Sequence, residues 1–170
     1  MTEKKTPPVA IVLGSDSDWA VMSKCAEQLD RFGVAYEVRV ISAHRTPGAA
    51  HDFAASARQR GVKVIIAAAG MSAALAGVMA SLTTLPVVGV PLAGGAMDGL
   101  DALLSTTMMP PGVPVAAVGI GAARNAAILA AQILALADAA LTDMLAAFKK
   151  DLAGEVEAKD KALQAKLKSS

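Results

Sequence analysis

The chain has 170 residues and a formal net charge of +1, with 16 Lys and Arg against 15 Asp and Glu. This length suits one domain with a substantial buried core, and the balanced charge gives no reason to expect binding to nucleic acid or to an anionic membrane. The single cysteine, Cys25, excludes an internal disulfide, and we expect it to be a small buried residue in a protein of the reducing cytoplasm.

A polar turn follows the first predicted strand, which covers residues 8–13. The turn reads Gly-Ser-Asp-Ser-Asp and leads into a helical pattern over about 17–32. Gly14 permits a tight turn, Ser15 offers a hydroxyl to a phosphate, and Asp18 can accept hydrogen bonds from a sugar diol. Serine and aspartate are also ordinary N-cap residues, so this segment alone leaves open a capped helix without any ligand.

The segment after the second predicted strand, residues 35–41, combines a proton carrier, a cation and two hydroxyls. It reads Ser-Ala-His-Arg-Thr-Pro over 42–47, and its last two residues indicate an N-cap followed by proline at the start of a helix over 47–60. The motif therefore lies between a strand end and a helix start, where open α/β sheets place ligands and where backbone N–H groups favour anions. Imidazole can both release and take up a proton at neutral pH, and an arginine fork binds phosphate bidentately.

The rest of the chain continues the alternation of strands and helices. Further strands are predicted at 62–68, 86–90 and 114–119, and further helices at 72–82, 98–107 and 122–150. Five such units predict a three-layer α/β fold of flavodoxin-like or Rossmann-like type, with helices on both faces of a parallel sheet and a C-terminal helix. Gly70 and the Gly94-Gly95 pair fall in strand-to-helix turns, so the candidate ligand groups should share one rim of the sheet.

The apolar content is high for a solitary domain, at 54% hydrophobic residues and a mean hydropathy of +0.48. Residues 122–148 are apolar around most of a helical circumference. Five polar residues interrupt every window of about 20 residues that a membrane span would need: Arg124, Asn125, Gln132, Asp138 and Asp143. We therefore expect this helix to be buried on several sides, partly by other subunits.

We expect one domain over 1–170, with a core at about 8–148 and a charged helix or arm at 149–170. The apolar run near the start is too short for a signal-peptide core of at least ~7 residues with a cleavage site, so the protein is expected to stay in the cytoplasm.

The inventory of reactive groups favours proton transfer. The only two histidines, His44 and His51, are seven residues apart with no acidic third ligand, so neither a metal site nor a cofactor is expected. No G-x-S-x-G elbow is present for nucleophilic catalysis. His51, two helical turns beyond the motif, is expected to be exposed.

The two motifs together carry a specific resemblance. Gly-Ser-Asp-Ser-Asp-Trp at 14–19, followed by Ser-Ala-His-Arg-Thr-Pro at 42–47, resembles the bacterial 5-(carboxyamino)imidazole ribonucleotide mutases, enzymes of de novo purine synthesis. The resemblance covers roughly residues 8–138 and continues in the segments 65–70, 85–91, 99–105, 109–115 and 125–133.

The resemblance implies a reaction and the residues that perform it. In this family a carboxylate leaves the exocyclic nitrogen of the substrate as carbon dioxide, and the resulting aminoimidazole ribonucleotide is carboxylated at a ring carbon, which then loses its proton. By position, His44 matches the general acid and base. The matching substrate-binding positions are Ser42 and Arg45 at the phosphate, Ser15 and Asp18 at the ribose and phosphate end, and Gly70 and Ser72 in the loop after the third strand. The resemblance also implies a homo-octamer.

The loop after the third strand departs from the mutase pattern. Most bacterial mutases carry a segment of the form AGxAAHLxG, whereas this chain has Ala74 in place of the second histidine. Ser72 with an apolar residue at 74 resembles the related aminoimidazole ribonucleotide carboxylases, which use carbon dioxide directly but usually have lysine in place of Arg45. The mutase branch matches best, while a direct carboxylase and a non-catalytic nucleotide-binding homologue stay open. A flavodoxin-like FMN carrier would share the architecture.

Overall fold

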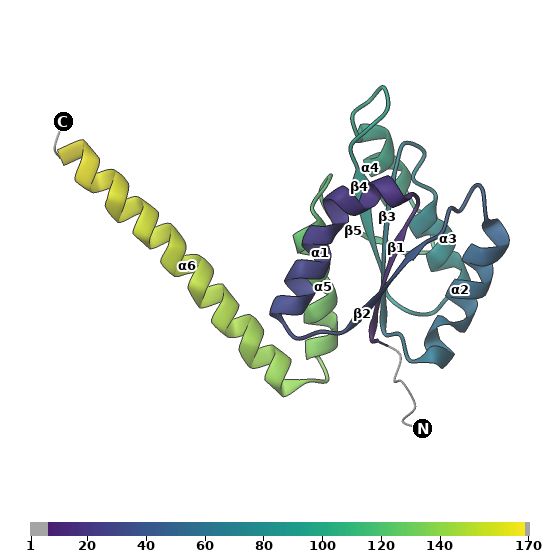
Figure 1. Cartoon of the computed structure of the whole chain (residues 1–170), viewed down its shortest axis with the longest axis horizontal. Helices are drawn as coiled ribbons and strands as arrows, with labels where there is room; N and C mark the ends of the chain where they lie inside the picture. Colours follow the sequence, from purple (N-terminus) through teal and green to yellow (C-terminus); the bar gives the residue numbers. More distant parts are fainter. Residues whose placement is uncertain (1–6, 169–170) are drawn as a thin grey trace. The chain divides into compact units, whose positions relative to one another are not determined.

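The computed structural model describes residues 7–168, and in them a sheet of five parallel strands forms the centre of an α/β unit (Figure 1). The strands are β1 (Val9–Leu13), β2 (Tyr36–Val40), β3 (Val64–Gly70), β4 (Val87–Leu92) and β5 (Ala116–Ala117). Their order is β2-β1-β3-β4-β5, and each neighbouring pair is parallel. This is the flavodoxin-like order, so the predicted fold class is confirmed.

The helices alternate with the strands along the chain. They are the 3-10 turn η1 (Asp16–Asp18), α1 (Trp19–Arg31), α2 (Pro47–Arg60), α3 (Leu75–Leu82), α4 (Leu100–Thr107), α5 (Ala123–Ala135) and α6 (Ala139–Lys168). The chain forms two compact units, which divide between Leu134 and Ala135, so α6 belongs to a unit of its own. No helix within residues 7–168 has the length and hydropathy that a membrane crossing requires.

The core of the α/β unit lies on both faces of the sheet. Every residue of β1 is buried, as expected for a parallel strand covered on both sides. Ala10 and Val12 pack in one cluster with residues of α2 and α3, such as Ala54 and Met79, and the alternation along the strand points Ile11 to the other face. Figure 1 shows α2 and α3 on one side of the sheet and α1 and α5 on the other.

The last predicted helix and the last predicted strand differ in extent from the structure. The helix expected over 122–150 is two helices, because the chain turns after Ala135 and Asp138 starts α6 by accepting a hydrogen bond from the Leu141 N–H at 3.0 Å. The strand expected over 114–119 has only two residues, Ala116 and Ala117. It pairs with β4 at the edge of the sheet, and the preceding Pro114 has no N–H with which to extend the pairing.

Gly89 in β4 lies where a side chain has no room, and this position yields a stability prediction. A Cβ there would lie 2.9 Å from Val115 Cγ1 and would collide with Thr106 Cγ2. We expect Gly89→Ala to lower the free energy of unfolding by about 1–3 kcal/mol, as overpacked cores do, measured by urea denaturation. Gly48→Ala is the control, because its Cβ would meet no atom within 4 Å. An unchanged midpoint for Gly89→Ala would contradict this packing.

Candidate active site

A cavity of about 570 Å³ lies at the carboxyl ends of the central strands. The chain passes from β1 to β2 on one side and places β3 on the other side of β1, so the strand order reverses between β1 and β3. Open α/β sheets bind ligands at such a reversal. The lining residues come from the loops after β1, β2, β3 and β4, within the ranges 14–18, 42–45, 69–75 and 92–95.

The loop after β1 is a tight polar turn. The Gly14 N–H donates to the Ala68 carbonyl at 3.0 Å, which ties the turn to β3. The Ser15 N–H donates to Asp18 Oδ2 at 2.9 Å, so the carboxylate of Asp18 lies back against the turn. Burial raises the pKa of Asp18, while hydrogen bonds from the N–H groups of Ser15 and Gly14 act in the opposite direction. Asp18 is therefore a fixed, half-buried acceptor at the cavity.

Hydroxyl groups extend this polar side of the cavity. The Ser17 hydroxyl donates to Ser15 Oγ at 3.0 Å, and the Ser15 hydroxyl donates to Asp16 Oδ1 at 3.1 Å. Ser15 and Ser17 both line the cavity. Because hydroxyls rotate easily, these two can turn toward a phosphate without any movement of the backbone.

Arg45 joins the loop after β2 to the loop after β1. Its Nη2 donates to the Gly14 carbonyl at 3.3 Å, and its Nε lies 3.4 Å from Ser42 Oγ. The Ser42 N–H in turn donates to Thr46 Oγ1 at 3.1 Å, and the Thr46 hydroxyl donates to the Ser42 carbonyl at 2.9 Å. The predicted N-cap is confirmed: α2 starts at Pro47 with Thr46 as its N-cap residue.

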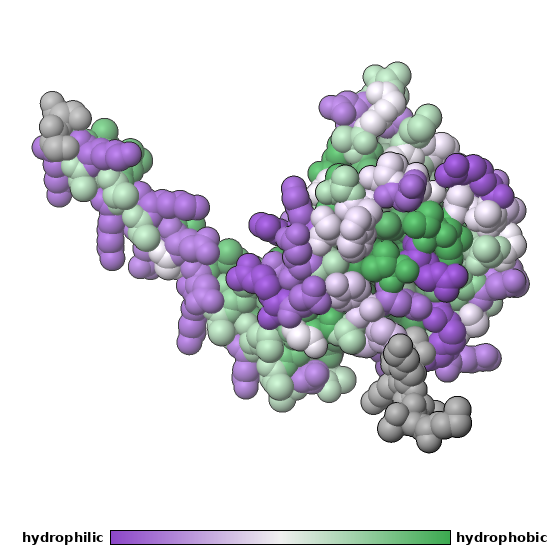
Figure 2. All heavy atoms as spheres, in the orientation of Figure 1, coloured by the Kyte–Doolittle hydropathy of each residue, from purple (hydrophilic) through white to green (hydrophobic). Residues whose placement is uncertain are grey.

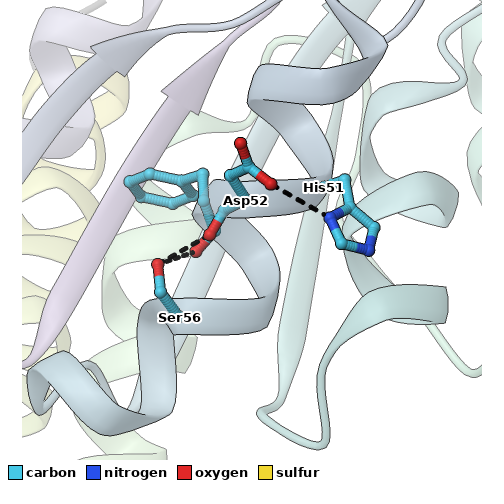
Figure 3. A network of polar contacts seen from close by, with 4 residues as sticks. His51, Asp52 and Ser56 are labelled. Atoms are coloured by element: carbon cyan, nitrogen blue, oxygen red, sulfur yellow. Dashed lines mark hydrogen bonds and ion pairs between the residues drawn. The ribbon is translucent and has the colours of Figure 1, made fainter.

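The two histidines have different positions. His44 lies in the turn after β2 and lines the cavity. His51 lies on α2 outside the cavity lining, with 61% of its side chain exposed and its Nδ1 3.2 Å from Asp52 Oδ1 (Figure 3). Ser56, one turn further on, donates its hydroxyl to the Asp52 carbonyl at 2.6 Å. His51 is thus exposed, as predicted.

The loop after β3 forms the less polar wall of the cavity. The predicted helix over 72–82 begins only at Leu75, because the preceding residues form a turn in which the Ala73 N–H donates to the Gly70 carbonyl at 3.1 Å. Met71 and Ala73 have positive φ angles of 54° and 21°, which non-glycine residues rarely adopt. Such strain persists where the surrounding structure enforces it, often at ligand sites.

All seven residues singled out from the sequence line this one cavity: Ser15, Asp18, Ser42, His44, Arg45, Gly70 and Ser72. Ala74 lines it as well. Sequence reasoning missed Met71 and the stretch Leu92–Ala93, which complete the lining. Met71 is 63% exposed and has a left-handed backbone, for which the sequence carries no signal. Among residues 7–168, no group of three or more His, Cys, Asp or Glu is arranged to hold a metal ion.

Comparison with known proteins identifies the family. A family model described as AIR carboxylase matches residues 8–155. The chain belongs to this family. It is 52% identical over 160 residues to an N5-carboxyaminoimidazole ribonucleotide mutase of Mycobacterium leprae, with 94% of each chain covered. It is 49% identical over 162 residues to a protein of the same name from Pyrococcus horikoshii, with 95% of this chain and 92% of the relative covered.

The fold comparison agrees. The crystal structure of Treponema denticola PurE matches with a TM-score of 0.83 and 30% identity, covering 91% of this chain and 97% of that one. The resemblance inferred from the two motifs is therefore confirmed at the level of the family.

Proposed function

We propose that this chain is an N5-carboxyaminoimidazole ribonucleotide mutase of de novo purine synthesis. One observation carries the proposal: a single cavity at the reversal of strand order gathers a histidine, an arginine, several hydroxyls and an anchored carboxylate. Relatives that bear this name share about half of its residues over nearly the whole chain. The arrangement suits a phosphorylated substrate whose reaction needs one proton carrier.

The polar side of the cavity would bind the ribonucleotide. Among the described lining residues Arg45 is the one Lys or Arg, and its contacts with Gly14 and Ser42 hold the guanidinium at the mouth of the β1 turn. A guanidinium fork binds phosphate bidentately, and the N-terminus of α2 adds favourable N–H groups. Ser15 and Asp18 would bind the ribose and phosphate end.

The β3 loop would hold the other end of the nucleotide. Gly70 and Ser72 line the cavity beside Ala69, Ala73 and Leu75, which makes this wall mostly apolar. The backbone of the loop and the Ser72 hydroxyl would therefore face the imidazole ring of the substrate. Carbon dioxide is uncharged, and an apolar wall favours its retention over escape to water.

His44 would move the proton that the reaction requires. Protonated His44 gives its proton to the exocyclic nitrogen as the N–CO2 bond breaks and carbon dioxide is released. The ring carbon then attacks carbon dioxide, and neutral His44 removes the proton from that carbon. The imidazole ends in its starting state, so one residue serves as both acid and base.

We further propose a homo-octamer that binds nucleotide in the cytoplasm. Several large apolar side chains on and around α4 are exposed, which supports contact with other subunits: Met97 at 52%, Leu100 at 46%, Leu104 at 48%, Met108 at 78% and Ile120 at 41%. The number of subunits follows from the family resemblance. The lone thiol, buried Cys25, fits a reducing compartment.

Ala74 favours a second candidate, the direct carboxylase, because it lines the cavity where bacterial mutases carry a second histidine. Assays with each substrate separate the two. A mutase converts the carboxyamino ribonucleotide without added bicarbonate, and we expect this result. A direct carboxylase needs aminoimidazole ribonucleotide with bicarbonate and leaves the carboxyamino substrate unused. Turnover of neither substrate would contradict both enzymatic assignments and indicate a non-catalytic nucleotide-binding protein.

The role of His44 is tested by removing its titrating group. We expect His44→Asn to keep the fold and most of the nucleotide affinity, because asparagine retains a polar side chain, while turnover falls by at least ~100-fold, the low end for a general acid and base. Initial rates and nucleotide binding measured on the same preparation separate the two effects. His51→Asn, outside the cavity, is the matched control and should remain active. If His44→Asn keeps more than about a tenth of wild-type turnover, the proton carrier is another group.

A further inference from the structure

Met71 lies at the opening of the cavity, on its less polar side. It lines the cavity, yet 63% of the residue is exposed, so it lies where the cavity meets solvent. The apolar side chains of the same wall, Ala73, Leu75 and Leu92, are buried. In Figure 2, apolar and hydrophilic atoms both lie at the upper end of the α/β unit, where the loops that follow the strands gather. Met71 is therefore a large apolar side chain at the exposed edge of a buried apolar wall.

The side chain of Met71 also reaches the loop after β4. A Cβ at Gly95 would lie 3.5 Å from Met71 Cγ, which is an ordinary van der Waals distance. Met71 thus packs against a position that carries no side chain of its own. Gly94 and Gly95 both line the cavity, and their loop is exposed. The contact therefore connects the β3 and β4 loops across the edge of the apolar wall.

The backbone of Met71 indicates that its side chain has a use. Its φ of 54° lies in the left-handed region, which glycine adopts without steric cost and other residues rarely adopt. The family pattern AGxAAHLxG leaves this position open, because Met71 stands at its first x. A glycine would satisfy the backbone better, so what this position gains from methionine is an apolar side chain at the cavity. Strain of this kind is found where it serves a ligand site.

Resting on the proposed mutase reaction, we propose that Met71 covers the apolar wall and keeps the released carbon dioxide in the cavity until the ring carbon takes it up. Once the N–C bond of the carboxyamino group has broken, carbon dioxide has two fates. It forms the C–C bond to the ring carbon, or it escapes and is hydrated to bicarbonate. A long, unbranched apolar side chain at the opening slows the escape, as the closure of an active site does for other labile intermediates.

This role makes Met71 a determinant of where the carboxyl carbon comes from. With the cover in place, the carbon of the substrate's own carboxylate enters the product. Without it, the released molecule exchanges with dissolved carbon dioxide, and the aminoimidazole ribonucleotide left in the cavity is carboxylated from solution. The uncovered cavity would then use carbon dioxide as a direct carboxylase does.

Isotope retention tests the proposal in the full-length protein. The substrate carries ¹³C in its carboxylate, the buffer contains an excess of unlabelled bicarbonate with carbonic anhydrase, and mass spectrometry measures the fraction of ¹³C lost from the carboxylated product. Enzyme is used in excess over substrate, in a single turnover, because a carboxyamino compound also loses carbon dioxide spontaneously. The result is a ratio between two fates of one intermediate, so a change in the overall rate does not alter it.

Two variants of Met71 separate its side chain from its backbone. We expect the wild type to retain most of the label and Met71→Gly to raise the exchanged fraction at least ~3-fold, because the opening is then uncovered. Met71→Gly should melt within about 3 °C of the wild type, since glycine fits the left-handed φ. Met71→Leu restores an apolar side chain of similar size and should retain label as the wild type does.

Equal exchange in the wild type and in Met71→Gly would overturn the proposal, as would complete exchange in the wild type. Exchange in Met71→Leu as high as in Met71→Gly would also overturn it, because apolar cover would then not be what retains carbon dioxide. In each of these results the carboxyamino substrate is converted, so the mutase assignment stands. A wild type that leaves this substrate unconverted would instead overturn the mutase assignment, and this proposal with it.

Discussion

The reversal of strand order between β1 and β3 is the constraint on which the site depends. Because β2 and β3 lie on opposite sides of β1, the loops that leave these strands diverge and open a cavity between them. Parallel strands place all their carboxyl ends at one edge, so residues far apart in the sequence meet there. The hydrogen bonds of Gly14 to Ala68 and of Arg45 to Gly14 then fix the loops relative to the sheet.

The cavity is divided into two environments, and each comes from different strands. The loops after β1 and β2 supply hydroxyls, a carboxylate and the guanidinium of Arg45, while the loops after β3 and β4 supply mostly alanine, glycine and leucine. A phosphorylated nucleotide needs the first environment, and a reaction through carbon dioxide needs a dry wall near the imidazole. His44 belongs to the polar loops but faces the same cavity as Ala74, so the chemistry can take place where the two environments meet.

The elements that were predicted correctly can be recognised from their own residues alone. The buried strand β1 is a continuous apolar run, and Pro47 at the first helical position marks the start of α2. The meeting of the two motifs was predictable because parallel strands share an edge. The break at 136–138 was missed because an alanine-rich sequence favours helix throughout, and only the cap at Asp138 marks the new start. The left-handed backbone of Met71 was missed because residues other than glycine rarely adopt a positive φ, so a methionine in the sequence does not indicate one.

The position of a bound nucleotide tests the central claim most directly. A crystal structure with aminoimidazole ribonucleotide should show the phosphate at the guanidinium of Arg45 and the hydroxyl of Ser42, the ribose at Asp18, and the ring carbon that receives the carboxylate facing the imidazole of His44. A nucleotide bound in the opposite direction, with its phosphate at Ser72, or bound outside this cavity would contradict the account.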